Sequence, residues 1–346
     1  MRRNGQLKGF LRKGLMLVLS FLMMTIAFLP AGSAQAADSK WINAVWSKYK
    51  KYNTTVNASY NTYMAQLIKD YNTYFKSQND RLAELERIVL EDQKKWNEKF
   101  EADWTELKAR YENNDDLRGE LREFERSINP NSLSSPMGVY VRAANRNSLS
   151  STMGVFARAI NENSLSSYMY EYKKATNINS LSSPAYALHK TVTDTYLSSP
   201  MYALMKNSST NYLSSPIYVY SRGRISKASA QKQYAKLFTQ YTAQISQDSA
   251  TYKQQIATTA QSAQQKIEAL YLDTVKQLET QRNETLQAIS DNRKKLTGEG
   301  FTWEPLLVAP VEGSTGASAG SQAGNSANPS AEKAPDANQG TTAQQP

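Results

Sequence analysis

The chain of 346 residues has no cysteine and a single histidine, His189. Without cysteine it can form no disulfide, so its folded part must be stabilised by packing alone. One histidine leaves serine–histidine and cysteine–histidine mechanisms without a spare partner, and a zinc site would have to use carboxylates. We therefore expect no catalytic site, no metal site and no cofactor.

Other recurrent functional motifs are missing as well. The sequence contains no phosphate-binding glycine loop, P-loop or EF-hand loop. The segment 131–226 has only three acidic residues, Glu162, Glu171 and Asp194, and these do not cluster as the carboxylate pair of a glycosidase would. Its many Ser-Ser pairs are typical of turns and helix caps rather than of nucleophiles. These absences predict that the protein is not an enzyme.

Residues 1–36 have the pattern of a secretory signal peptide. Basic residues precede an apolar run from Leu15 to Leu29, which is shorter than the roughly 20 residues that span a bilayer. Ala34 and Ala36 form a small-x-small cleavage pattern, so the mature chain is expected to begin at Ala37. An uncleaved membrane anchor is the alternative. We expect a bacterial protein that is secreted, or held non-covalently in the cell envelope.

Two segments have an eleven-residue amphipathic period. From Tyr49 the apolar positions fall three, four and four residues apart, with no proline or glycine between Trp41 and Arg118. This spacing predicts a long helix over 37–128. The same period follows from Tyr234 and predicts a second helix over 227–297, closed by Gly298.

An eleven-residue period corresponds to 3.67 residues per turn, which is typical of a straight or right-handed supercoil. Because two helices of about 100 Å flank an insert, we expect an antiparallel hairpin or coiled coil that carries the insert at its far tip. A parallel dimeric or trimeric stalk is the alternative.

The insert, residues 129–226, contains six tandem units of sixteen residues, of which the first begins at Asn131 and the last ends at Ser226. Each unit contains Leu-Ser-Ser, and the leucines are Leu133, Leu149, Leu165, Leu181, Leu197 and Leu213. In one continuous helix successive leucines would be rotated by about 160°, and prolines at position six of four units also exclude such a helix. Each unit is therefore a separate piece of structure stacked on the next.

Two structures are consistent with a single unit. Ser135 could cap a short helix that begins at Pro136, with Leu133, Met137 and Tyr140 on one face. Alternatively, segments such as 217–220 form β-strands separated by Asn/Ser-rich turns, and the aromatic and β-branched content favours these strands. The expected fold class is mainly α, with a long hendecad helical hairpin and an inserted module of strand–turn repeats.

The repeats also hold the candidate contact residues. They carry nine basic and three acidic residues in a chain of net charge +10. Tyrosines beside basic residues would suit contact with a polymer, because weak binding at each unit adds up. Alternatively, the tyrosines form the stacking core and the basic residues a solvated face. The candidates are Tyr140, Tyr172, Tyr186, Tyr202, Tyr218, Arg142, Arg158, Lys174, Lys190 and Lys206.

After the second helix, residues 298–310 form a short apolar segment that could dock on the helices. Residues 311–346 are rich in Gly, Ser, Ala, Pro and Gln and are predicted to be a disordered tail.

These features predict a secreted or envelope-associated structural or interaction protein, whose helical stalk presents the repeats for multivalent adhesion or assembly. The expected partner is an anionic cell-wall polymer or another surface ligand, with self-association through the stalk. A membrane is less favoured, and nucleic acid is not expected. The alternative function is a membrane-active or lipid-binding protein with a toxin-like hairpin, although a largely tyrosine stripe is not typical of lipid-binding helices.

Overall fold

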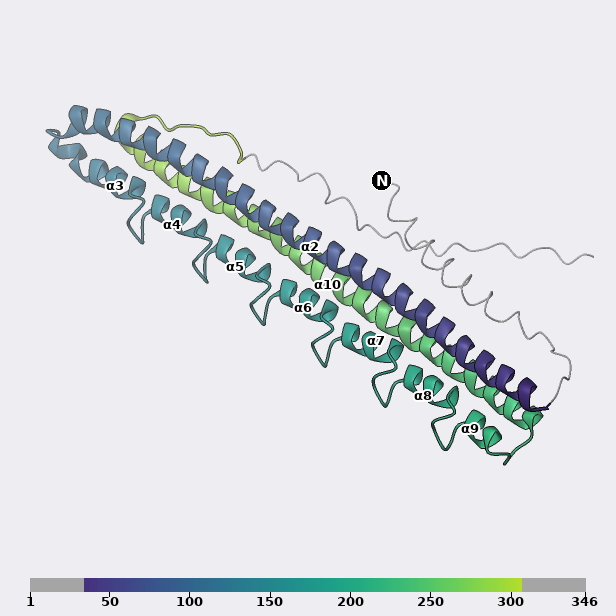
Figure 1. Ribbon diagram of the computed structural model, residues 1–346. Coiled ribbons are helices and arrows are strands. Elements are labelled where there is room, and N and C mark those ends of the chain that lie inside the picture. The colour runs from purple at the N-terminus through teal and green to yellow at the C-terminus, as the bar shows by residue number, and fades with distance from the viewer. Residues whose placement is uncertain (1–33, 307–346) are drawn as a thin grey trace, which may run out of the picture.

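The computed structural model describes residues 34–306, with side chains from residue 39 onward, and all regular structure in this part is helical. The predicted mainly α class is confirmed. Two long helices, α2 (Ala34–Tyr111) and α10 (Lys227–Thr297), lie side by side, and a row of short helices runs along them (Figure 1). The row consists of α3 (Arg118–Ile128), α4 (Pro136–Ala143), α5 (Thr152–Ala159), α6 (Tyr168–Thr176), α7 (Pro184–Val192), α8 (Pro200–Asn207) and α9 (Pro216–Ser221).

The two long helices run in the same direction. At three levels, hydrogen bonds between them join residues that are 190 apart in the sequence: Tyr52 with Thr242 (3.4 Å), Tyr74 with Gln264 (3.5 Å) and Asp92 with Arg282 (2.7 Å). In an antiparallel pair this difference would change along the helices. The prediction of an antiparallel hairpin is therefore wrong. The repeats are the return path between two parallel helices and, together with α3, lie along the rod (Figure 1).

The first long helix ends at Tyr111 and does not continue to residue 128 as expected. The polar segment 112–117 turns the chain, and Asn114 caps the short 3₁₀ helix η1 (Asp115–Leu117) by accepting a hydrogen bond from the Asp116 N–H at 3.1 Å. Helix α3 then runs back beside α2 and begins the row of short helices. The absence of proline and glycine did not prevent this turn, because asparagine and aspartate side chains stabilise it.

Each repeat unit is a short helix, so the prediction of strands is wrong. The second serine of each Leu-Ser-Ser caps the helix by accepting a hydrogen bond from the N–H three residues on, as Ser183 does from Tyr186 at 2.9 Å. Proline is the first helical residue in four units, as at Pro184. These start signals, together with burial of one helical face, outweigh the β-propensity of the tyrosine, valine and isoleucine residues.

Each repeat unit covers the same length of the rod as eleven residues of a long helix. At position ten of unit 1, the carbonyl of Tyr140 accepts a hydrogen bond from Gln93 at 3.3 Å. At position ten of unit 3, the ring of Tyr172 lies 5.1 Å from that of Tyr71. Two units of the row thus match 22 residues of α2, so each unit advances about 16.5 Å.

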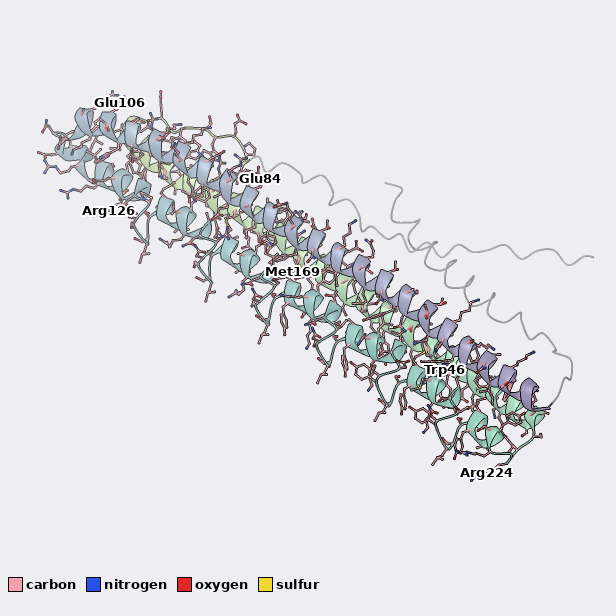
Figure 2. The ribbon with its side chains drawn as sticks, viewed as in Figure 1. Trp46, Glu84, Glu106, Arg126, Met169 and Arg224 are labelled. Atoms are coloured by element: carbon pink, nitrogen blue, oxygen red, sulfur yellow. The ribbon has the colours of Figure 1, made fainter. Side chains whose placement is uncertain are left out.

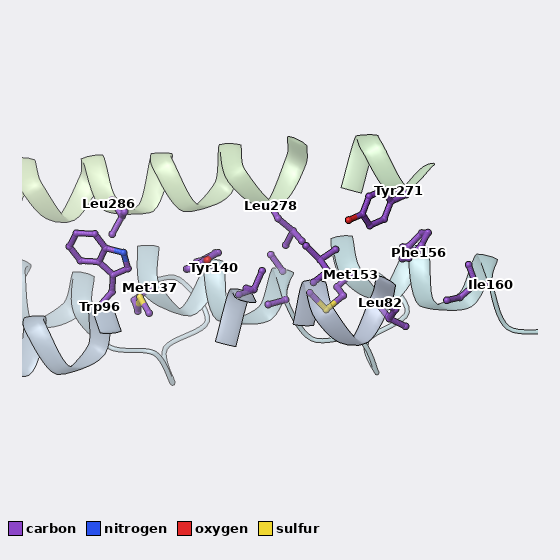
Figure 3. Packing of buried hydrophobic residues seen from close by; sticks show 14 of the residues in the cluster. Leu82, Trp96, Met137, Tyr140, Met153, Phe156, Ile160, Tyr271, Leu278 and Leu286 are labelled. Carbon is purple, nitrogen blue, oxygen red and sulfur yellow. The ribbon is translucent and has the colours of Figure 1, made fainter. Parts of the chain in front are cut away.

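The core lies between the three layers. In α2, residues eleven apart are buried: Tyr49, Tyr60, Tyr71, Leu82 and Gln93. In α10 the same is true of Tyr234, Ile245, Ile256, Ile267, Leu278 and Ile289. Figure 3 shows Trp96 of α2, Met137 of α4 and Leu286 of α10 close together in one part of this core. Each layer therefore contributes a buried stripe to a core that extends along the rod.

Residues 298–306 fold back along the end of the long helices. Gly298 ends α10 in a left-handed conformation, with φ of 79°. Phe301 then packs against both Trp96 and Phe100, with its ring centroid 5.5 and 5.6 Å from theirs. The Trp303 indole N–H donates to Asn283 at 2.9 Å.

The apolar run of the predicted signal peptide and the predicted disordered tail lie outside the described residues, and Ala34, Ala36 and Ala37 are described only as backbone in the first turns of α2.

Candidate functional site: the loop edge of the repeat row

The loops between the short helices project from the row, away from α2 and α10, and carry side chains on their outer side (Figures 1 and 2). Each repeat leucine lies in such a loop and is 71 to 79% exposed. The helical alternative placed Leu133 on one helical face with Met137, and this part of it is wrong, because Leu133 precedes the helix and is 78% exposed. We call the surface formed by Leu133, Leu149, Leu165, Leu181, Leu197 and Leu213 the leucine edge.

The loop shape is determined by the buried cap serine. In unit 2, the Ser151 hydroxyl accepts from Gly154 N–H at 2.9 Å and donates to the Asn145 carbonyl at 2.5 Å. The Asn145 side chain accepts from the Asn147 N–H at 2.9 Å, which tightens the start of the loop. The cap serine thus has a structural reason to recur in all six units. The leucine does not, because most of its surface faces solvent.

A basic residue occurs at position twelve of every unit. These residues are Arg142, Arg158, Lys174, Lys190, Lys206 and Arg222. Arg142 lies beside a leucine loop, where it donates to the carbonyls of Ser132 (3.2 Å) and Leu133. Arg158 and Leu149 line one groove of about 540 Å³ between successive loops and α2. The leucine edge is therefore accompanied by a row of cations.

Each of the three acidic residues of the repeats has a polar partner, and Glu162 also lines the groove that Arg158 and Leu149 share. Glu162 accepts a hydrogen bond from Tyr71 at 2.7 Å and pairs with Lys173 at 3.0 Å. Asp194, at the same unit position as Glu162, accepts a bond from Tyr49 of α2. Glu171 pairs with Lys266 of α10 at 3.6 Å. Nine basic residues against three partnered carboxylates leave the repeats with a net positive charge.

Two of the predicted contact residues belong to the core. Tyr140 and Tyr172 are 0 and 2% exposed and face α2, so they do not lie on a contact surface. Position ten falls on the inner face of each short helix, three residues after the buried position seven. Burial, with a smaller effect of the Asp70 charge, raises the pKa of Tyr172 to about 12. For these two residues, the alternative interpretation of a tyrosine core is the one the structure supports.

The other three predicted tyrosines, at position eight, are partly exposed, and two of them connect successive units. Tyr186 packs edge-to-face against Tyr196 with centroids 6.0 Å apart, and Tyr202 packs in the same way against Tyr212 at 6.1 Å. Tyr218 lies 5.2 Å from the Arg222 guanidinium. Since Tyr196 and Tyr212 directly precede a repeat leucine, these aromatic pairs support the loops of the last two units.

All five predicted basic residues lie at position twelve of their units, and the same position in unit 6 is Arg222. The five are Arg142, Arg158, Lys174, Lys190 and Lys206. The leucines were also missed as surface residues. The signal for both was present in the aligned units, where positions three and twelve keep their chemical character while position eight changes from glycine to tyrosine.

Within residues 34–306, no group of three or more His, Cys, Asp or Glu side chains is arranged to hold a metal ion. In the same part of the chain, no helix combines the length and apolar character needed to cross a membrane. Comparisons of the chain with protein-family models, with curated proteins and with solved structures found no match.

Proposed function

We propose that this chain is a non-enzymatic structural or interaction protein of the bacterial envelope or exterior, a rigid rod that presents identical loops for multivalent attachment. The observation that carries the proposal is the leucine edge, six leucines that are 71 to 79% exposed, each with a basic residue in its unit. The attachment surface is the length of the rod rather than its tip.

A rigid rod holds the loops at fixed distances from one another. Arg81 of α2 forms a two-pronged ion pair with Glu268 of α10 (2.5 and 3.1 Å), and Asp92 forms another with Arg282 (2.7 and 2.9 Å). Arg81 and Arg282 are both nearly buried, so each pair fixes the register of the long helices. In this proposal a hendecad supercoil of the long helices sets the spacing of the loops.

Fixed spacing favours a partner that offers repeated or continuous binding positions. Once one loop is bound, the next is held close to its own position, so weak contacts combine into stable attachment. A globular partner would contact one or two loops only and would gain little from the other units.

The test compares the mature chain with a shortened rod of four units. Units 3 and 4 (163–194) are removed together with 60–81 and 250–271, the stretches of the long helices that they cover. Retention on purified bacterial envelopes is measured by co-sedimentation. We expect retention to fall at least about tenfold, since two attachment points are lost. Equal retention of the two rods would contradict multivalent attachment.

A further inference from the structure

We propose that the leucine edge docks on the surface of an anionic lipid bilayer, with the rod lying along the membrane. This inference rests on the proposed function and names its partner. The edge combines two chemistries in every unit: an exposed leucine, which gains by leaving water, and a basic residue, which gains by approaching negative charge. An anionic bilayer surface offers headgroup phosphates and, just below them, acyl chains.

Other partners satisfy only part of this chemistry. A soluble anionic polymer pairs with the cations but leaves the leucines in water. A second copy of the chain, placed edge to edge, would bring two rows of cations together, because position twelve is basic in every unit. The attraction of a basic residue to a helix C-terminus explains a cation at position twelve but not the exposed leucine in the same unit.

The geometry of the edge also fits an extended surface. The loops leave the row on one side of the rod (Figure 1). Five steps of about 16.5 Å separate the first leucine from the last, so the edge is roughly 80 Å long. A bilayer contacts all of this length at once.

The last two units have further side chains suited to the membrane interface. Tyr196 and Tyr212 are partly exposed and directly precede Leu197 and Leu213. Tyrosine, with an apolar ring and a polar hydroxyl, is enriched at the headgroup level of membranes. Lys206 lies 6.0 Å from the Tyr212 ring, which places a cation beside this loop. We therefore expect units 5 and 6 to contribute most to docking.

The experiment uses the mature full chain and two kinds of vesicle, one of phosphatidylcholine alone and one with about one third phosphatidylglycerol. Two variants change the edge: Leu181→Ser with Leu197→Ser and Leu213→Ser, and Lys190→Gln with Lys206→Gln and Arg222→Gln. The control is Leu90→Ser with Leu272→Ser, because these leucines are 52 and 58% exposed but lie on the long helices. Circular dichroism checks that all variants fold, as expected for exposed positions.

The original chain should co-sediment with the anionic vesicles, and less so as salt is raised. The triple leucine variant should bind the anionic vesicles more weakly, by about tenfold for each leucine replaced. The cation variant should resemble the original chain at high salt, and the control should be unchanged. Absence of binding to anionic vesicles, or equal binding by the leucine variant, would overturn the proposal. So would a leucine-dependent dimer in sedimentation velocity.

A third measurement separates this inference from the proposed function. Binding to inorganic polyphosphate, or to purified envelopes, is compared between the six-unit and four-unit rods. Dependence on unit number without vesicle binding would leave multivalent attachment standing and remove the lipid surface as the partner. Independence of unit number on envelopes would remove multivalent attachment itself.

Discussion

The match between sixteen residues of the row and eleven of each long helix can be tested by deletion. Removing units 3 and 4 (163–194) alone leaves 22 residues of each long helix, about 33 Å, without cover. The remaining units would have to stretch across this gap if α2 and α10 keep their 190-residue offset.

The stability lost in this deletion can be estimated from the buried side chains that it removes. Met169, Tyr172 and Leu188 are each at most 2% exposed and belong to the deleted units. Removal of a large buried side chain costs about 2–5 kcal/mol, so the three together cost about 6–15 kcal/mol. Whole domains are stable by about 5–15 kcal/mol. The deletion alone should therefore lower the thermal midpoint by more than about 10 °C or abolish cooperative unfolding.

The matched deletion of 163–194, 60–81 and 250–271 should restore a single cooperative transition. It removes Tyr60 and Tyr71 together with the units that cover them. It also brings Glu162 opposite Tyr49, the position that Asp194 occupies now, because both acids have the same place in their units. The acid–tyrosine hydrogen bond is thereby kept.

Thermal unfolding followed by far-ultraviolet circular dichroism provides the measurement. A control deletion removes 163–194 with only 61–80 and 251–270, which rotates the buried stripes of the long helices by about 200°. It should be as unstable as the deletion of the units alone. The reasoning is refuted if the unmatched deletion or this control melts as high as the matched one.

Three further predictions concern single sites. Gly154→Ala should cost about 1–3 kcal/mol in urea unfolding, because a Cβ there would lie 1.7 Å from the Ser148 carbonyl oxygen; an unchanged midpoint would contradict this. Ser167→Ala should cost about 1–2 kcal/mol, since its hydroxyl bonds Tyr170 N–H and the Asn161 carbonyl, whereas the exposed Ser166→Ala should be near neutral. Burial raises the pKa of Tyr234 to about 12 from 10.0, as it does for Tyr172, so stability should be complete below pH 10 and fall as the pH rises towards 12; a urea midpoint constant over this range would show that these tyrosines are not protonated more tightly in the folded state.

The long helices could be predicted from sequence because a helical period is recorded in the spacing of residues such as Tyr49, Tyr60 and Tyr71. Their relative direction could not, since a periodic stripe reads the same for a parallel and an antiparallel neighbour. Only contacts such as that of Asp92 with Arg282 distinguish the two. The start of each short helix was readable at Ser135 and Pro136, but the aromatic and β-branched residues that follow favoured strands. Burial of one helical face decided the outcome, and a short apolar run does not reveal that burial.

The candidate surface was only partly predictable. The basic residues were identified, but a repeated leucine is interpreted by default as a core residue. The structure reverses this for the leucine edge, because the cap serine two residues later starts the helix and leaves the leucine outside it. Tyr140 and Tyr172 were predicted as surface contact residues but lie in the core. Position ten can be assigned to the inner face only once the unit is known to be helical.

The shared step of the three layers also limits how a gene for this rod can change. Tandem repeats ordinarily gain and lose copies through unequal recombination, one array at a time. Here an additional unit has no helix surface to cover unless insertions of eleven residues occur in two other, distant parts of the same gene. The number of repeat units is therefore fixed by the lengths of the two flanking helices, and the units cannot be gained or lost one at a time.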